Sequence, residues 1–465
     1  MAPWLWPFFL DGLEYFSTPS QVIYTRRIGA PIAAAKVTGK SGGTSYGFLS
    51  AVDGAEASLS GRDRPVFNLL RIQKDVGGTS RFGMAYTDRI ERDDYNRVVE
   101  ADGRWVFGGI NSLAIHGAVS RTRDSTGRFA GPLWSAKLAR TGRRLGFTAL
   151  FEAAGDRFRA GSGFVYQRDV ALVNGGPTVT FYGRPGALLE RLNVAVTANY
   201  RWAYQRFIAG ESPRDRQYWF NGTWTLRGGY TLGTTAFVET FGYDERFYTD
   251  YRLEVPTATG KDTVGYGIKA DLPVRAGMVR LTTPEVHGIG FDGFAAYGRD
   301  PNYLEWSKSE IVFARLGLTY RPSERLRFEL GMPVLIHYRR TDGTQVDREV
   351  IPRLKMEYQV SRAIFVRFVG EYRSAHQDDL RDDARTNHPI LIRDPADGVF
   401  KRSLALRQET NELRVDWLFS FQPTPGTVFF AGYGSSLVEP ESFRFGGLKR
   451  TKDGFFTKLS YLFRL

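Results

Sequence analysis

The chain has 465 residues, of which 24% are charged and 14% aromatic, and its formal net charge is +13. It contains no cysteine, which excludes a disulfide framework, a thiolate metal site and a cysteine nucleophile. No window approaches the roughly 20 apolar residues of a transmembrane helix. Arginine is spread along the chain among acidic residues and is not concentrated on one element, which argues against a nucleic-acid-binding protein.

The beginning of the chain does not have the pattern of a strand. Residues 1–16 (MAPWLWPFFLDGLEYF) carry no basic region and no small-residue cleavage site, so they are not a secretion signal. Either processing has removed such a signal or the chain is the C-terminal part of a longer precursor, and we favour the second interpretation. We expect a non-strand segment over 1–20, acting as a plug or as a linker from an upstream domain, and a strand-forming region over 21–465. The expected contacts of the first segment, inside the lumen or at its mouth, are Trp4, Trp6, Phe8, Phe9, Tyr15 and Phe16.

Further along the chain, apolar and polar residues alternate with a period of two. The windows that show this alternation are 191–202, 325–339, 347–360, 364–373 and 412–421. In 325–339 the even positions from Leu326 to Tyr338 are apolar, whereas the odd positions include Arg327 and Glu329. Successive side chains of a strand point to opposite faces, so each window predicts a strand with one apolar and one charged face.

These strands predict an all-β fold, a single antiparallel transmembrane β-barrel with up-and-down meander connections and roughly 16–22 strands. A large soluble β-sandwich is the alternative, because its strands also alternate. Apolar faces that end in Tyr, Trp or Phe are typical of the aromatic girdles of a membrane barrel and favour the first interpretation.

The connections are expected to fall into two length classes. Short ones are predicted at 321–324, 359–362 and 422–426, and long ones at 242–261, 376–399 and 436–453. The last strand, 455–465, is expected to close the barrel, to be presented to the barrel-assembly machinery and to end at the periplasm. The short turns would then be periplasmic and the long loops extracellular, in the outer membrane of a Gram-negative cell.

The charged faces are expected to line the lumen, because an arginine facing lipid at mid-membrane costs roughly 2–4 kcal/mol. The predicted lumen-lining residues are Arg325, Arg327, Glu329, Arg339, Glu349, Arg353, Lys355, Glu357, Arg367, Glu371, Arg373, Glu412, Arg414 and Asp416. An excess of positive charge would favour anions in such a lumen. The other reading is that the pairs only rigidify the wall and that extracellular arginines bind lipid phosphates.

Several passages together are similar to one envelope family. They are PFFLDGLEYF (7–16), IYTRRIG (23–29), RIQKDVGGTSRFGMAYTDR (71–89), DYNRVVEADGRWVFGG (94–109), PTPGTVFFAGYG (423–434) and GFFTKLSYLFRL (454–465). The chain thus resembles, from about Pro7 to its end, the barrel domain of unknown function that typically follows a family-9-like carbohydrate-binding β-sandwich in Gram-negative envelope proteins. The sequence departs from that layout by lacking the sandwich and the signal peptide, and the resemblance assigns no site residue.

No motif of catalysis or cofactor binding stands in a suitable context. Gly43–Gly47 matches the G-x-S-x-G pattern but lies in a turn between strands, and Gly288–Gly293 matches G-x-G-x-x-G but leads into a strand. The acidic stretch 378–383 could hold Ca²⁺, yet its spacing and its arginine neighbours favour an exposed charged loop. We expect no enzyme activity, no cofactor and no metal.

Three functions remain open at this point. The first is an outer-membrane channel for small polar or anionic solutes, including saccharides. The second is a non-conducting barrel that anchors an upstream carbohydrate-binding-like domain, and the third is an outer-membrane hydrolase. Outer-membrane lipid, lipopolysaccharide and the assembly machinery are the expected partners, and nucleic acid is not.

Overall fold

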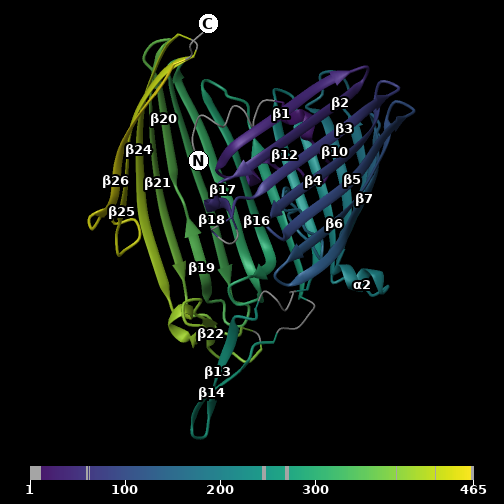
Figure 1. Cartoon of the computed structure of the whole chain (residues 1–465). Coiled ribbons are helices and arrows are strands. Elements are labelled where there is room, and N and C mark those ends of the chain that lie inside the picture. The colour runs from purple at the N-terminus through teal and green to yellow at the C-terminus, as the bar shows by residue number, and fades with distance from the viewer. Residues whose placement is uncertain are drawn as a thin grey trace. The chain divides into compact units, whose positions relative to one another are not determined.

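The computed structural model describes residues 12–58, 61, 63–242, 248–267, 272–383, 385–424 and 426–461. Twenty-two strands form one antiparallel sheet with meander connections. This is the all-β architecture of an outer-membrane β-barrel, as the alternating windows predict (Figure 1). Among the described residues, no helix has the length and apolar character needed to cross a membrane.

The bounds of the elements are as follows. The large sheet contains β1 (Pro31–Ser41), β2 (Thr44–Asp53), β3 (Val66–Val76), β4 (Ser80–Glu91), β5 (Asp94–Phe107), β6 (Asn111–Asp124), β7 (Gly127–Thr141), β8 (Leu145–Ala154), β9 (Val170–Tyr182), β10 (Leu189–Trp202), β11 (Asp215–Leu226), β12 (Tyr230–Phe241), β15 (Leu272–Thr282), β16 (Ile289–Asn302), β17 (Ser307–Ser323), β18 (Leu326–Tyr338), β19 (Gln345–Val350), β20 (Arg353–Gln359), β21 (Ile364–Gln377), β24 (Gln408–Thr424), β25 (Thr427–Val438) and β26 (Lys449–Ser460). A small sheet contains β13 (Tyr251–Thr257), β14 (Gly260–Gly265), β22 (Ile390–Arg393) and β23 (Phe400–Lys401). The helical turns are η2 (Leu13–Phe16), η3 (Thr25–Arg27), η4 (Ala55–Ala57), α2 (Tyr204–Ile208) and η6 (Arg402–Ala405).

The chain divides into two compact units, which are described separately. Unit 1 comprises residues 1–179 and 195–218, and unit 2 comprises residues 180–194 and 219–465. Strands β1 to β8 lie in unit 1, strands β12 to β26 lie in unit 2, and β9, β10 and β11 contribute residues to both.

In unit 1 the segment before β1 packs against one face of the sheet. Phe16, Val22 and Ile28 are almost fully buried and form a core with side chains of β2 to β7, among them Leu49 and Phe67. The other face of the same strands exposes large apolar side chains, such as Phe48 next to Leu49. The alternation along each strand therefore separates a core face from an exposed apolar face.

A glycine makes room for this segment. A Cβ atom added to Gly47 on β2 would lie 3.0–3.3 Å from ring atoms of Phe16. The small residue thus allows the aromatic ring to lie directly on the backbone of the sheet. At the other end of the segment, the backbone N–H groups of Gly29 and Ala30 donate to the carboxylate of Asp53 at 2.7 and 2.6 Å.

In unit 2 the strands have the two faces that the sequence predicts. One continuous cross-strand row on the apolar face consists of Tyr320, Phe328, Met356, Phe368, Trp417, Tyr433 and Phe455, each directly opposite the next. Trp417 is 46% exposed and Phe455 71% exposed. A contiguous apolar surface of this extent is unfavourable in water and requires a cover.

One predicted strand is interrupted. The window 347–360 forms β19 and β20, separated by Ile351 and Pro352, and both pair with β18 and with β21. Proline has no backbone N–H to donate to a neighbouring strand, which accounts for the break. The two segments pair with successive parts of β18 and β21 and together occupy the place of one strand in the sheet.

The connections of unit 2 have two to six residues at one edge, whereas the opposite edge has all the connections longer than six residues as well as two short ones. At one edge, the short-turn edge, they are 227–229, 283–288, 324–325, 360–363 and 425–426. At the opposite, long-loop edge they are 242–271, 303–306, 339–344, 378–407 and 439–448. A short turn or a long loop lies at each predicted place, but the bounds differ, since β17 extends to Ser323 and β24 to Thr424. Antiparallel pairing places the end of β26 at the short-turn edge. Of the predicted closing strand 455–465, residues 462–465 lie outside the described part.

Candidate functional site

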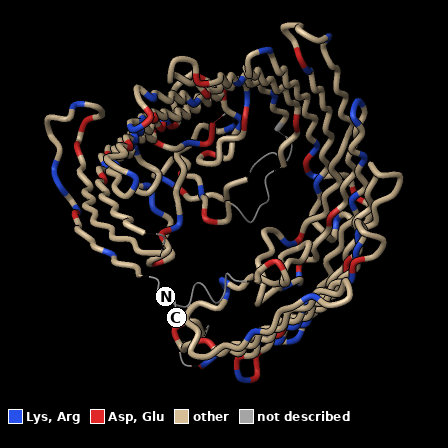
Figure 2. Tube along the Cα trace, turned by 90° about the horizontal axis from the view of Figure 1, so that it is seen from above, with Lys and Arg blue, Asp and Glu red and all other residues tan. Residues whose placement is uncertain are grey.

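The charged face of unit 2 is the strongest candidate for a functional surface. Residues directly opposite one another on neighbouring strands share a face, and the register pairs Arg327 with Glu357 and Glu329 with Lys355. Between β20 and β21 it pairs Arg353 with Glu371, and between β21 and β24 it pairs Glu371 with Arg414. Opposite charges thus alternate across four adjacent strands. Basic and acidic residues are interspersed along the strands in Figure 2.

Most neighbours on this face are ion-paired. The Lys355 Nζ atom lies 2.9 Å from Glu357 and 3.7 Å from Glu329, and Arg373 lies 2.6 Å from Glu349. These side chains are between a quarter and a half exposed, so each pair adds at most about 1 kcal/mol to stability. Their main effect is to hold long side chains in a fixed arrangement on the wall.

The charged face bounds a hollow of about 570 Å³. Four cations line it, Arg315, Arg327, Arg353 and Lys355, together with the carboxylates of Glu285, Asp292, Glu329 and Glu371. Each of these carboxylates is ion-paired, with Arg321, Arg280, Arg327 and Arg353 respectively. Within the described residues, Arg315 forms no ion pair. Arg315 lies within electrostatic range of Asp292, but that carboxylate is already bound to Arg280.

The structure places twelve of the predicted lumen-lining residues on this one face. They are Arg327, Glu329, Glu349, Arg353, Lys355, Glu357, Arg367, Glu371, Arg373, Glu412, Arg414 and Asp416. The other two lie elsewhere. Arg325 is in the short turn between β17 and β18, and Arg339 follows the end of β18 and lies in the 339–344 connection.

Sequence reasoning missed the part of the hollow that β15, β16 and β17 form. Arg280 binds Asp292 at 2.8 Å, and Arg315 projects from β17 opposite Pro333. The register of β16 with β17 is the same on both sides of positions 292 and 293, so Asp292 and Phe294 lie on the same face as Arg315. Phe294 and Phe313 stand on this face among its polar residues, so the alternation of apolar and polar residues is harder to recognise in the sequence.

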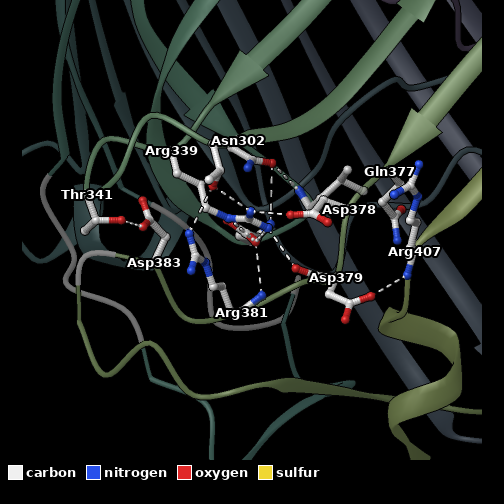
Figure 3. Close-up of polar contacts among 12 residues, drawn as sticks. Asn302, Arg339, Thr341, Gln377, Asp378, Asp379, Arg381, Asp383 and Arg407 are labelled. Atoms are coloured by element: carbon white, nitrogen blue, oxygen red, sulfur yellow. Dashed lines mark hydrogen bonds and ion pairs between the residues drawn. The ribbon is translucent and has the colours of Figure 1, made fainter.

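Arg339 belongs to a buried polar cluster at the long-loop edge of unit 2 (Figure 3). Its guanidinium binds Glu305 at 2.6 Å and Asp378 at 2.7 Å, and its side chain is 1% exposed. A further N–H donates to the carbonyl oxygen of Asp379 at 2.8 Å. One arginine thus joins the connections 303–306, 339–344 and 378–407.

The electrostatics of this cluster depend on burial and on arginine. Burial raises the pKa of Glu305, while the hydrogen bonds from Arg339 oppose that rise. For Asp378 burial also acts upward, but the hydrogen bonds from Arg339 and from the Asp379 backbone N–H, together with the charge of Arg339, outweigh it and lower the pKa. The pKa of Asp342 is held far below its usual range by the hydrogen bond from Arg381 and by the N–H and hydroxyl groups of Thr344.

The acidic stretch 378–383 is not the exposed loop that the sequence suggested. Leu380, Asp382 and Asp383 are each at most 3% exposed. Asp382 pairs with Arg385, and the hydroxyl of Thr341 donates to Asp383. The prediction of exposure is wrong because these partners come from other positions of the folded loops. In the described part of the chain, no group of three or more His, Asp or Glu residues is arranged to hold a metal ion.

A serine and a histidine meet in unit 1. The Ser20 hydroxyl hydrogen-bonds the Nε2 atom of His116, beside a hollow of about 410 Å³ that Glu152 also lines. Asp102 stands opposite His116 in the register of β5 and β6. However, both Asp102 oxygens bind Arg71, at 2.5 and 3.1 Å. Asp102 is therefore committed to another partner, and the pair's structural role is to hold the segment before β1 on the sheet.

No protein-family model matches the chain, and no curated protein matches its sequence. Several solved outer-membrane proteins are similar in structure. One is OmpT, an outer membrane protein of Vibrio cholerae (10% identity, TM-score 0.32, covering 75% of this chain and 94% of that one). Others are the siderophore receptor PiuA from Acinetobacter baumannii (8%, 0.41, 92% and 73%) and OccK2 of Pseudomonas aeruginosa, solved in complex with glucuronate (12%, 0.28, 86% and 92%). Identities and TM-scores at this level assign neither a function nor a ligand to this chain.

Proposed function

We propose that this protein is an outer-membrane β-barrel channel that passes small polar or anionic solutes along the charged face of unit 2. The observation that carries the proposal is the hollow bounded by that face. Its carboxylates are each paired with a cation, whereas Arg315 has no ion-pair partner among the described residues.

Anions are the favoured solutes because of this imbalance. A paired carboxylate presents little net charge to a passing ion, while an unpaired guanidinium presents a full positive charge and five N–H donors. A solute carboxylate or phosphate can accept two of these hydrogen bonds at once. The formal net charge of the whole chain, +13, is also positive and favours anions.

The orientation in the membrane is part of the proposal. The short-turn edge would face the periplasm and the long-loop edge the cell exterior, as is general for bacterial outer-membrane barrels. The C-terminal strand would end at the periplasmic side, where the barrel-assembly machinery would receive it.

Conductance in a planar lipid bilayer tests the channel. The refolded protein should give discrete conductance steps, and a KCl gradient should give a reversal potential of the sign expected for anion preference. Arg315→Gln should reduce that preference, whereas Arg362→Gln, which removes the same charge in the 360–363 turn, should not. A correctly folded barrel that conducts nothing would contradict the proposal.

A second candidate is a non-conducting barrel that anchors an upstream carbohydrate-binding-like domain. The observation that favours it is the packing of residues 16–28 against the sheet of unit 1, which fills space on that face. A silent bilayer recording from folded protein would support this candidate. Conductance that appears only after residues 1–30 are removed would instead make the segment a plug of a channel.

A further inference from the structure

We infer that the apolar face of unit 2 carries, at its long-loop edge, a binding site for the phosphate groups of a membrane lipid. Four cations from consecutive elements form the site: Arg275 on β15, Arg299 on β16, Lys308 on β17 and Arg340 in the 339–344 connection. We call these four residues the basic patch.

The strand register places the patch on the apolar face and not on the charged one. Glu310, which binds Arg299, lies directly opposite Tyr338, the last apolar residue of β18. Tyr297 is two residues before Arg299 on the same face and is 66% exposed. On β15, Val279 shares the face of Arg275 and is 52% exposed. The patch therefore continues the apolar band toward the loops.

The patch carries more positive charge than its surroundings neutralise. Glu310 binds Arg299 at 2.9 Å and lies 3.8 Å from Arg340. Arg275, Arg299 and Arg340 all lie within electrostatic range of the Lys308 ammonium group. Among the residues that the structure describes, no carboxylate forms an ion pair with Arg275 or Lys308. Within this described part of the chain, Glu310 is thus the one carboxylate near Arg299, Lys308 and Arg340, and the mutual repulsion of the four cations is relieved when an anion binds.

The position of the patch identifies the anion as part of a lipid. The surface on one side of it is apolar and exposed, which suits acyl chains, while the cations stand where headgroups begin. Phosphate accepts several hydrogen bonds at once and suits guanidinium groups in particular. With the long loops extracellular, as in the proposed function, the lipid is that of the outer leaflet, a phosphorylated lipopolysaccharide.

A fluorescent reporter beside the patch tests this inference. The chain has no cysteine, so Tyr297→Cys supplies a single thiol for an environment-sensitive dye. We expect the folded, labelled protein in detergent to bind bisphosphorylated lipid A at least about tenfold more tightly than the same lipid without its phosphates. Equal binding of the two lipids would overturn the inference.

Variants separate the patch from net charge. Replacing Arg275, Lys308 and Arg340 by Gln should weaken lipid A binding about tenfold. Replacing Arg227, Arg321 and Arg362 by Gln removes the same charge near the short-turn edge and should leave binding unchanged. Inorganic phosphate at lipid concentrations should not compete, and full competition would assign the patch to a soluble anion. Because binding is measured in detergent, the outcome does not depend on whether the barrel conducts. If the triple variant does not fold, the single variant Lys308→Gln and the comparison of lipid A with the lipid without phosphates test the inference.

Discussion

Ion pairs in the long loops of unit 2 differ greatly in how much they stabilise the packing of these loops. Arg339 and Glu305 are 1% and 0% exposed, so neither charge has water to replace its partner. Arg407 and Glu409 form a bond of the same length, 2.6 Å, but the arginine is 64% exposed. Burial, and not distance, therefore decides which of these two pairs holds the loops together.

The first prediction concerns that buried pair. Arg339→Met should leave Glu305 as an uncompensated buried charge and destabilise the joined loops by about 3–5 kcal/mol. Hydrogen exchange of residues 378–407 in the folded barrel should accelerate accordingly. Arg407→Met is the matched control and should cost under about 1 kcal/mol. If Arg339→Met left exchange unchanged, the cluster would not hold the loops; the double variant with Glu305→Leu should recover most of the loss.

Arg339 also shows where strand prediction from the alternation of apolar and polar residues fails. Its odd number matches the charged face of β18, so alternation alone predicts a wall residue. The strand ends at Tyr338, and the Glu305, Asp378 and Asp379 partners of Arg339 are 34 to 40 residues away in the sequence. Strand alternation is a local signal, whereas the folding of loops onto one another depends on contacts that the period does not contain.

At the scale of elements, the two faces of each strand differ in what they tolerate. Leu354 on β20 lies in a cross-strand row with Leu318 and Leu330 on the apolar face. Leu354→Arg should destabilise the protein in lipid vesicles by about 2–4 kcal/mol. Glu357→Arg, on the charged face of the same strand, should cost much less. Equilibrium unfolding in urea measures both, and equal costs would mean that the apolar face does not meet lipid.

The segment before β1 yields a second prediction at this scale. Phe16 is 2% exposed on the core face, whereas Phe48 on β2 is 42% exposed on the other face. Phe16→Ala should leave a cavity that costs about 3–5 kcal/mol and loosen the segment. A cysteine placed at Ser20 should then react faster with a maleimide. Phe48→Ala should not change that rate; a similar rate in all variants would show that Phe16 does not hold the segment.

Elements also differ in how well the sequence predicts them. Windows such as 325–339 and 412–421 became β18 and β24 because their alternation is unbroken. The window 347–360 was predicted as one strand, but Pro352 divides it, since proline cannot complete the ladder. The hollow was only half predicted, because the apolar Phe294 and Phe313 share the charged face with Asp292 and Arg315 and obscure the alternation in β16 and β17.

At the scale of the whole molecule, a channel in the outer membrane requires that lipid covers the apolar face and that water covers the charged face. Nitroxide scanning along β24 tests it most directly, because a chain without cysteine allows one label at a time. In lipid vesicles, labels at Trp417, Phe419 and Phe421 should be accessible to oxygen and shielded from a water-soluble nickel complex. Labels at Arg414 and Asp416 should show the reverse. Accessibility to the nickel complex that alternates from one residue to the next supports lipid on the apolar face and water on the charged face. Equal accessibility of both faces to the nickel complex would contradict it.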